Sequence, residues 1–165
     1  MPAVSNTSPI FNLACIGRLD LLRTLFEEIW IPSGVETELI QIPDTAIRGR
    51  VEQARNGGWL MVRPTTKADL VKLLTVDLHQ GEAEAIALAV ETKADRLLID
   101  EKEGREMARR LGLHITGVLG ILLRAKRMGQ IAAIKPDLLA LRDQARFFVS
   151  RELEVEILES TGEQT

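Results

Sequence analysis

Short apolar runs alternate with longer amphipathic segments along the chain, and this pattern predicts its elements. The short runs are rich in Val, Ile, Leu and Trp and predict five buried strands, at residues 3–5, 28–31, 59–63, 96–99 and 114–116. Apolar positions at helical spacing predict ten helices, at residues 9–16, 19–26, 34–42, 45–55, 67–74, 82–92, 102–111, 117–128, 136–145 and 150–158. Because strands alternate with helices, we expect an α/β fold, a three-layer α/β/α sandwich around a central, mainly parallel sheet.

Polar residues mark several of the predicted helix starts. Ser8 precedes Pro9, which predicts an N-cap followed by proline at the first helical position. Ser33 is followed three residues later by Glu36, the spacing of a capping box. Asp44 is placed to cap the helix after that.

The composition indicates one folded domain. The chain has 165 residues, of which 45% are hydrophobic and 27% charged, so we expect residues 1–159 to form a single domain with a substantial core. The polar residues 160–165 are expected to form a disordered tail. The one cysteine, Cys15, excludes a disulfide framework and a cysteine-based zinc site, and its apolar surroundings in the sequence place it in the core.

The sequence also limits where the protein acts. No apolar run reaches the roughly 18 residues of a membrane-spanning helix, and no basic segment precedes an apolar stretch at the start. We therefore expect a cytoplasmic protein with no membrane association. The net charge of −3 argues against a generally basic nucleic-acid binder but allows a local basic patch.

Polar side chains follow two of the predicted strands. Asn6 follows the first strand and Asp100 the fourth, and the two lie side by side if these strands are neighbours at the carboxyl edge of a parallel sheet. Helices that cross the same edge can add Glu38 and either Glu82 or Glu84. Several carboxylates around one small space repel one another unless a cation compensates. Hard oxygen ligands of this kind suit Mg²⁺ or Mn²⁺, ions that serve phosphodiester hydrolysis.

Each acidic residue also has a purely structural interpretation. Glu38 fits a solvent-facing helix position, and Asp100 fits the cap of the helix that follows it. Capping and metal ligation are compatible for Asp100, because a carboxylate has two oxygens. Glu82 and Glu84 flank the apolar stripe of their helix on opposite sides, so the side chains diverge and the sequence does not choose between them.

Basic residues follow Asp100 on the next predicted helix. Lys102 and Arg105 would suit the phosphate backbone of a nucleic acid bound beside an acidic site. For Arg109 and Arg110 on the same helix, a solvated face is at least as good an explanation.

Several ordered segments resemble one known family. They are Val4-Ser5-Asn6-Thr7-Ser8-Pro9, Ile31-Pro32-Ser33-Gly34-Val35-Glu36-Thr37-Glu38-Leu39, Gly81-Glu82-Ala83-Glu84-Ala85-Ile86-Ala87-Leu88-Ala89, Leu97-Leu98-Ile99-Asp100-Glu101-Lys102-Glu103-Gly104-Arg105 and Gly117-Val118-Leu119-Gly120-Ile121-Leu122-Leu123-Arg124-Ala125-Lys126. With these the chain resembles, over residues 3–158, the PIN-domain proteins, which include VapC-like toxin ribonucleases. It is most similar to a subgroup of that family known only as a domain of unknown function.

The resemblance implies a site and a reaction. The acidic positions of the family fall on Asn6, Glu38, Glu82 or Glu84, and Asp100, where they would hold one or two Mg²⁺ or Mn²⁺ ions for the hydrolysis of RNA. The hydroxyls of Thr7 and Ser8 match the polar residues that follow the first acid and would contact substrate. A small antitoxin protein is the partner that a toxin of this family implies.

Asn6 departs from the pattern, because the family usually has an aspartate at this position. An amide oxygen can ligate a cation but brings no charge. Two hypotheses follow: a metal-dependent endoribonuclease that acts as the toxin of a toxin–antitoxin pair, or a catalytically weakened module of the same fold that binds RNA or a protein partner.

The apolar residues of 115–123 and 138–141 exceed what one side of a helix needs. A homodimer interface and the core explain this surplus equally well, and we expect a homodimer.

Overall fold

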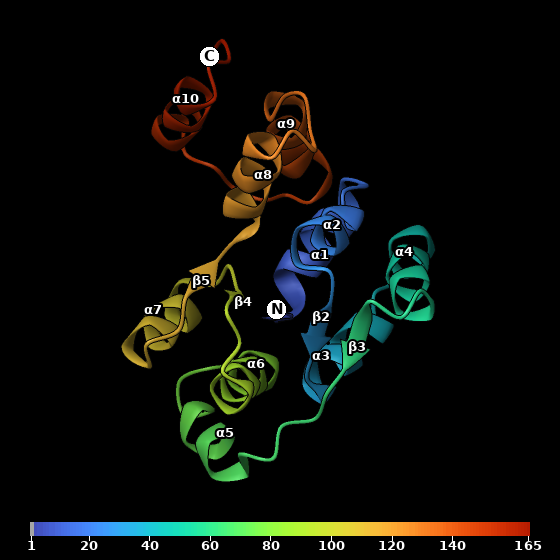
Figure 1. The fold of residues 1–165 in the computed structure, drawn as a ribbon, viewed down its shortest axis with the longest axis vertical. Helices are drawn as coiled ribbons and strands as arrows, with labels where there is room; N and C mark the ends of the chain where they lie inside the picture. The colour runs from blue at the N-terminus through green and yellow to red at the C-terminus, as the bar shows by residue number, and fades with distance from the viewer. Residues whose placement is uncertain (1) are drawn as a thin grey trace.

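The computed structural model describes residues 2–165, and a parallel five-stranded sheet forms its centre (Figure 1). The strands are β1 (Ala3–Ser5), β2 (Ile29–Ile31), β3 (Leu60–Val62), β4 (Leu97–Leu98) and β5 (Ile115–Thr116). Their order across the sheet is β3-β2-β1-β4-β5, and every neighbouring pair is parallel. The strand order reverses between β1 and β4, so the carboxyl ends of these two strands flank the crevice where open parallel sheets bind ligands.

Ten helices surround the sheet in the described residues 2–165. They are α1 (Thr7–Cys15), α2 (Asp20–Phe26), α3 (Ser33–Ile40), α4 (Thr45–Asn56), α5 (Ala68–Leu74), α6 (Gln80–Thr92), α7 (Lys102–Arg110), α8 (Val118–Arg127), α9 (Lys135–Gln144) and α10 (Arg151–Ser160). Within these residues no helix is long and apolar enough to cross a membrane.

Two apolar cores lie on opposite faces of the sheet. Ala3 and Leu98 pack into the core formed with α1–α4 and α8–α10, whereas Val4 and Leu97 pack into the core formed with α5, α6 and α7. Adjacent strand residues alternate between the cores because successive side chains point to opposite faces. The prediction of a three-layer α/β/α sandwich with a parallel sheet is thereby confirmed, and Cys15 is buried.

Helix α6 is enclosed on several sides. Nearly all residues from Gly81 to Ala89 are buried, since α6 packs on the sheet and also contacts α3, α5 and α7. Small side chains make this possible, because alanine lets neighbouring elements approach closely from several sides. This helix fixes the acidic residues that it carries between α3 and α7.

Two predicted helix caps differ from the structure, and a third is confirmed. Helix α1 begins at Thr7 with Asn6, not Ser8, at its N-cap, and α3 begins at Ser33 after Pro32, with no capping bond from either cap side chain. Glu36, expected in a capping box, instead pairs with Arg55 of α4 at 2.5 Å. The cap at Asp44 is confirmed, since its Oδ1 accepts hydrogen bonds from the N–H groups of the second and third residues of α4.

The last residues of the chain contact the helix before them. Glu163 accepts hydrogen bonds from the backbone N–H of Ile134 and Lys135 at 3.0–3.1 Å, and so caps α9. The hydroxyl of Thr161 donates to the same carboxylate at 2.8 Å. The division into a domain of residues 1–159 and a disordered tail stays a prediction, but these contacts tie Glu163 to the folded part.

Candidate functional site

Asn6 and Asp100 lie at the crevice where the strand order reverses. Asn6 directly follows β1, and its backbone N–H donates to the carbonyl of Leu98 in β4 at 3.1 Å. Asp100 lies two residues after the end of β4. The pairing of β1 with β4, in the register Ser5 to Leu98, is what brings these two distant parts of the sequence to one edge.

The Asn6 side chain is buried, with 2% of the residue exposed, and only half of its amide is used. Its Nδ2 donates to Oε2 of Glu101 at 2.7 Å. Its Oδ1 is buried and has no hydrogen-bond partner. An orphaned buried carbonyl oxygen costs about 1–3 kcal/mol, so this atom lowers the stability of the fold and has an acceptor site open for a ligand.

Asp100 is likewise half-satisfied. Its Oδ1 accepts the backbone N–H of Val118 at 2.9 Å, while its Oδ2 is buried without a partner. Burial raises the pKa of Asp100 to about 6, helped by the charge of Glu101 and opposed by the Val118 hydrogen bond, Arg105 and the Asn12 side chain. The expectation that Asp100 caps the helix after it is wrong: Val118 opens α8, and Asp100 caps that helix instead.

The two hydroxyls that follow Asn6 are bonded to carboxylates. Thr7 donates through its Oγ1 to Oε2 of Glu38, and Ser8 donates through its Oγ to Oε1 of Glu101. These bonds hold Glu38 and Glu101 against the first turn of α1. Contact of Thr7 and Ser8 with substrate stays a prediction.

Four glycines make room for the carboxylates of the site. A Cβ at Gly81 would lie 2.5 Å from a Glu38 oxygen, and one at Gly117 would lie 2.5 Å from Asp100 Oδ1. A Cβ at Gly104 would lie 2.9 Å from Oε2 of Glu82, and one at Gly34 would collide with Oε2 of Glu84. A side chain at any of these positions would displace the acid that it faces.

Glu82 and Glu84 diverge, in keeping with their places on opposite sides of the α6 stripe. Glu82 is buried, faces Gly104 of α7, and accepts the His79 backbone N–H at 3.3 Å. Burial raises the pKa of Glu82, and the nearby charge of Glu101 adds to this shift. Glu84 is half-buried and faces Gly34 of α3. Glu82 therefore lies between α6 and α7, and Glu84 lies between α6 and α3.

The two basic residues expected beside the site differ in their surroundings. Lys102 is exposed. Arg105 is half-buried, its charge favours ionised Asp100, and its Nε is buried with no acceptor. Arg105 therefore has a donor free for a ligand beside Asp100.

The oxygen donors of the site are of the type that a hard divalent cation binds, although they are not gathered around one common position. Among residues 2–165, no group of three or more His, Cys, Asp or Glu side chains is gathered closely enough to hold a metal ion. The potential donors are oxygens, as Mg²⁺ and Mn²⁺ require. Asn6 Oδ1 and Asp100 Oδ2 are unpartnered, whereas Glu38 and Glu101 would have to exchange their bonds to Thr7, Asn6 and Ser8.

Two residues that the structure brings to the site were given no role on sequence grounds, although Glu101 directly follows the family's fourth acidic position. Glu101 bonds both Asn6 and Ser8, and Asn12 of α1 lies beside Asp100. Asn12 is a polar residue, 7% exposed, in an otherwise apolar helical run, and that mismatch is a signal that the sequence does carry. Glu101 had only its position next to Asp100 to mark it.

A parallel α/β/α sandwich with acidic residues at its switch point defines the class of the protein as an open α/β fold with a candidate ligand site at that crevice. The chain belongs to the PIN-domain family, because it matches the family model DUF3368, a PIN domain, over residues 2–163. PIN domains are in general divalent-metal-dependent nucleases. The resemblance drawn from the sequence motifs is thus confirmed at the level of the family.

A solved structure supports the fold. A PilT N-terminus domain protein from the hyperthermophilic archaeon Sulfolobus solfataricus P2 superimposes with a TM-score of 0.53. The two chains are 21% identical, and the alignment covers 76% of this chain and 93% of that one, a likeness that speaks for the fold alone. A search of curated proteins finds no significant match.

Proposed function

We propose that this protein is a Mg²⁺- or Mn²⁺-dependent endoribonuclease that hydrolyses RNA phosphodiester bonds at the β1–β4 crevice. The observation that carries the proposal is the pair of buried, unpartnered oxygens, Asn6 Oδ1 and Asp100 Oδ2, at the edge where parallel sheets bind ligands. A bound divalent ion would supply charge stabilisation for the phosphate and an activated water.

The residues of the chain would divide the work. Asn6 and Asp100 would hold the ion through their free oxygens, with Glu38, Glu101 and one or both of Glu82 and Glu84 adding charge. Thr7 and Ser8 would keep Glu38 and Glu101 oriented toward the crevice. Arg105 and Lys102 would contact the phosphate backbone of the substrate beside Asp100.

Cleavage of RNA by wild type and by Asp100→Ala tests the proposal. We expect wild type to cut single-stranded RNA with Mn²⁺ or Mg²⁺, to lose this activity in EDTA, and to exceed Asp100→Ala by at least about 100-fold. Asp95→Ala, which removes an exposed carboxylate before β4, is the matched control and should cut as wild type does. Equal background cleavage by wild type and Asp100→Ala would rule the proposal out.

The second candidate is a catalytically weakened module that binds RNA or a protein partner. It is favoured by the neutral side chain of Asn6, whose Nδ2 faces Glu101 and leaves the site one negative charge short of a full acidic set. Asn6→Asp distinguishes the two. If wild type is inactive and Asn6→Asp cleaves RNA, the site is a weakened nuclease site. If both proteins are inactive, the binding module is favoured.

We further propose that this enzyme is the cytoplasmic toxin of a toxin–antitoxin pair, and that it acts as a homodimer. A small reading frame next to its gene whose product co-purifies with it would support the toxin role. Light scattering at micromolar concentration would distinguish a homodimer from a monomer. A chain whose expression leaves growth unaffected while it cleaves RNA in vitro would contradict the toxin role.

A further inference from the structure

A cavity of about 490 Å³ runs beside the edge strand β5 and ends at Asp100. Its walls come from β5 and α8 on the inside and from α10 and the segment before it on the outside. Four arginines line it, and we call it the arginine groove after them: Arg96, Arg105, Arg124 and Arg127. The groove therefore connects the candidate site to a cationic surface at the edge of the sheet.

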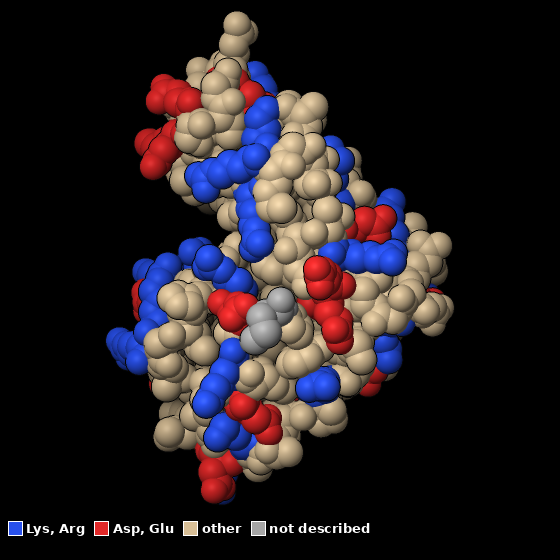
Figure 2. All heavy atoms as spheres, in the orientation of Figure 1, with Lys and Arg blue, Asp and Glu red and all other residues tan. Residues whose placement is uncertain are grey.

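The positive charge in the arginine groove is not neutralised by the protein. Asp100 is the one carboxylate among its lining residues, and none of the four arginines forms an ion pair within residues 2–165. The Nε of Arg105 is buried without an acceptor. Figure 2 shows Lys and Arg side chains on both sides of the hollow between the α10 end of the molecule and the α7–β5 side. Unpaired guanidinium groups around a hollow favour a polyanionic ligand.

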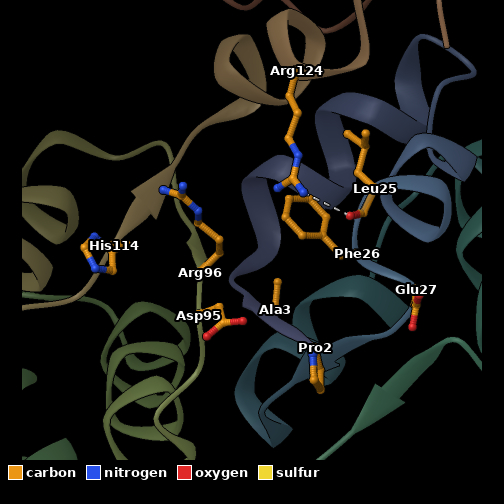
Figure 3. A pocket seen from close by; sticks show the side chains of 9 residues that line it. All are labelled: Pro2, Ala3, Leu25, Phe26, Glu27, Asp95, Arg96, His114 and Arg124. Carbon is orange, nitrogen blue, oxygen red and sulfur yellow. Dashed lines mark hydrogen bonds between the residues drawn. The ribbon is translucent and has the colours of Figure 1, made fainter. Parts of the chain in front are cut away.

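Two of these arginines also reach a second cavity, whose lining is mixed in charge. Arg96 and Arg124 line this cavity, of about 560 Å³ at the amino ends of the strands, together with His114 and the carboxylates Glu27 and Asp95 (Figure 3). Arg124 is held in place there, since its guanidinium lies 4.8 Å from the Phe26 ring and donates to the Leu25 carbonyl at 3.4 Å. In Figure 3 the Arg124 side chain reaches down from α8 to the Phe26 ring, and Arg96, which directly precedes β4, lies across the cavity from it.

We propose that the arginine groove binds the phosphodiester backbone of the RNA segment that flanks the candidate site. The planar forks of arginine match phosphate oxygens, and the apolar wall with Leu119, Leu123 and Phe147 can contact the sugars and bases. From Arg96 to Asp100 the chain spans on the order of 13 Å at about 3.3 Å per strand residue, so the groove extends well past a single phosphate at the crevice. The identity of the ligand as RNA rests on the proposed function.

An acidic protein segment is the competing occupant. The groove favours RNA because Asp100, beside which the scissile phosphate would lie, is one of its lining residues. A regular polyanion would also supply a charge to each separate arginine, whereas a peptide would need carboxylates at matching intervals. The experiment below treats preferential protein binding as an outcome that overturns the proposal.

Binding of a fluorescent oligouridylate in EDTA, measured by anisotropy over a series of salt concentrations, tests the groove without requiring cleavage. The variant is the double substitution Arg96→Gln with Arg127→Gln, at two exposed residues whose loss should leave the fold intact. Each lost phosphate contact should reduce the slope of log K against log salt by about 0.7, so the double variant should lose about 1.4. Affinity at low salt should fall roughly tenfold.

Two control proteins make the result specific. Arg23→Gln with Arg142→Gln removes the same charge from exposed positions outside the groove, and should keep the wild-type slope. Arg96→Lys with Arg127→Lys keeps the charge and should restore most of the slope. Equal losses in the groove variant and in the Arg23–Arg142 variant would overturn the proposal, because net charge alone would then explain the effect.

The outcomes separate this inference from the proposed function. A wild type that cleaves RNA while the groove variant binds and cleaves equally well overturns the groove alone. Loss of slope in the groove variant with no cleavage by any form supports the groove and contradicts the nuclease. If the groove variant binds RNA as wild type does but no longer binds a co-purifying acidic protein, the groove is not an RNA site.

Discussion

Asp100 combines two roles that conflict energetically. One oxygen caps α8, while the other is buried without a partner, and the carboxylate is charged at neutral pH at a cost that burial imposes. A residue placed only to cap a helix would have no reason to bury its second oxygen. The residue therefore trades stability for a negative charge at the crevice.

We expect Asp100→Asn to stabilise the protein in EDTA at neutral pH while abolishing cleavage. A pKa of about 6 in place of 3.8 corresponds to about 3 kcal/mol of unfolding free energy, at about 1.4 kcal/mol per unit. The amide keeps an acceptor for Val118 but leaves its own NH₂ unpaired, so the expected net gain is about 1–2 kcal/mol. Urea unfolding measures it.

The pH dependence of this gain follows from the sign of the shift. The raised pKa means that folded wild type takes up a proton more readily than the unfolded chain, so the burial penalty is full above pH 6 and is relieved as the pH falls from 6 toward 3.8. The advantage of Asp100→Asn should shrink over that range. Asp95→Asn, at an exposed carboxylate, should change stability little at any of these pH values.

Glu101 places a carboxylate next to Asn6, and so brings to this part of the site the negative charge that an aspartate at position 6 would have supplied. It is bonded to the Asn6 amide and the Ser8 hydroxyl, so its negative charge already lies against the first-strand turn. We expect Glu101→Gln to weaken Mn²⁺ binding by roughly tenfold or more and Asn6→Asp to strengthen it, because ligand charge sets the affinity of oxygen sites. Calorimetric titration with Mn²⁺ gives the affinities independently of cleavage.

The reciprocal double variant decides whether the two positions are interchangeable. Asn6→Asp with Glu101→Gln keeps the total charge of wild type, and should bind Mn²⁺ with an affinity between those of the single variants. Additive behaviour, with each substitution acting as though the other were absent, would show that the two side chains do not share one ion.

At the scale of elements, the site depends on helices that approach closely through glycine. Helices α3, α6 and α7 converge on the crevice, and the carboxylates lie in spaces that a methyl group would fill. The site therefore depends on how closely these helices approach one another, and not only on where the helices begin and end.

Gly81→Ala tests this dependence with little risk to the fold. Its Cβ would displace the Glu38 carboxylate and break the bond to Thr7, and a small misplacement of a catalytic group can cost up to about 100-fold in kcat/KM. Unfolding free energy should change by less than about 1 kcal/mol, since only the end of a long side chain must move. Steady-state kinetics with urea unfolding measure both quantities.

Gly49→Ala in α4 is the matched control for Gly81→Ala. A Cβ at Gly49 meets no atom within 4 Å, so alanine there should stabilise the helix by up to about 1 kcal/mol and leave cleavage unchanged. Full activity in Gly81→Ala would show that the position of Glu38 does not matter to the reaction.

The elements themselves were largely predictable from the sequence, for a physical reason. Burial on a sheet or on a helix stripe demands apolar residues at fixed periods, and the five strands and ten helices follow those periods. Helix starts were harder to predict from the sequence, because Glu36 pairs with Arg55 of another helix and not with its own N-terminus. Local patterns do not report such long-range competition.

The candidate site was also predictable only as far as local sequence patterns determine it. Asn6, Glu38 and Asp100 came from motifs and strand ends, whereas the hydrogen bond that the Val118 N–H donates to Asp100 depends on the packing of α8 against β5. Strand alternation would have pointed Glu101 away from Asp100. The chain leaves the strand after Leu98, so alternation no longer applies and Glu101 turns to Asn6.

At the scale of the whole molecule, the C-terminal residues close the layer that carries α8 and α9. Figure 1 shows α10 at the end of the molecule away from α5, next to α8 and α9. The chain then returns to α9, where Glu163 accepts the first free N–H groups of that helix. Because α10 also forms the outer wall of the arginine groove, this contact bears on the shape of the groove.

We expect Glu163→Ala to lower the free energy of unfolding by about 1 kcal/mol, as the loss of a helix cap does. The effect should appear as a lower urea midpoint with an unchanged slope, because the folded state loses a contact and no surface. Glu159→Ala, at an exposed position of α10, removes the same charge and should leave the midpoint in place. An unchanged midpoint for Glu163→Ala would mean that residues 160–165 are the disordered tail that their composition indicates, and that α9 begins without them.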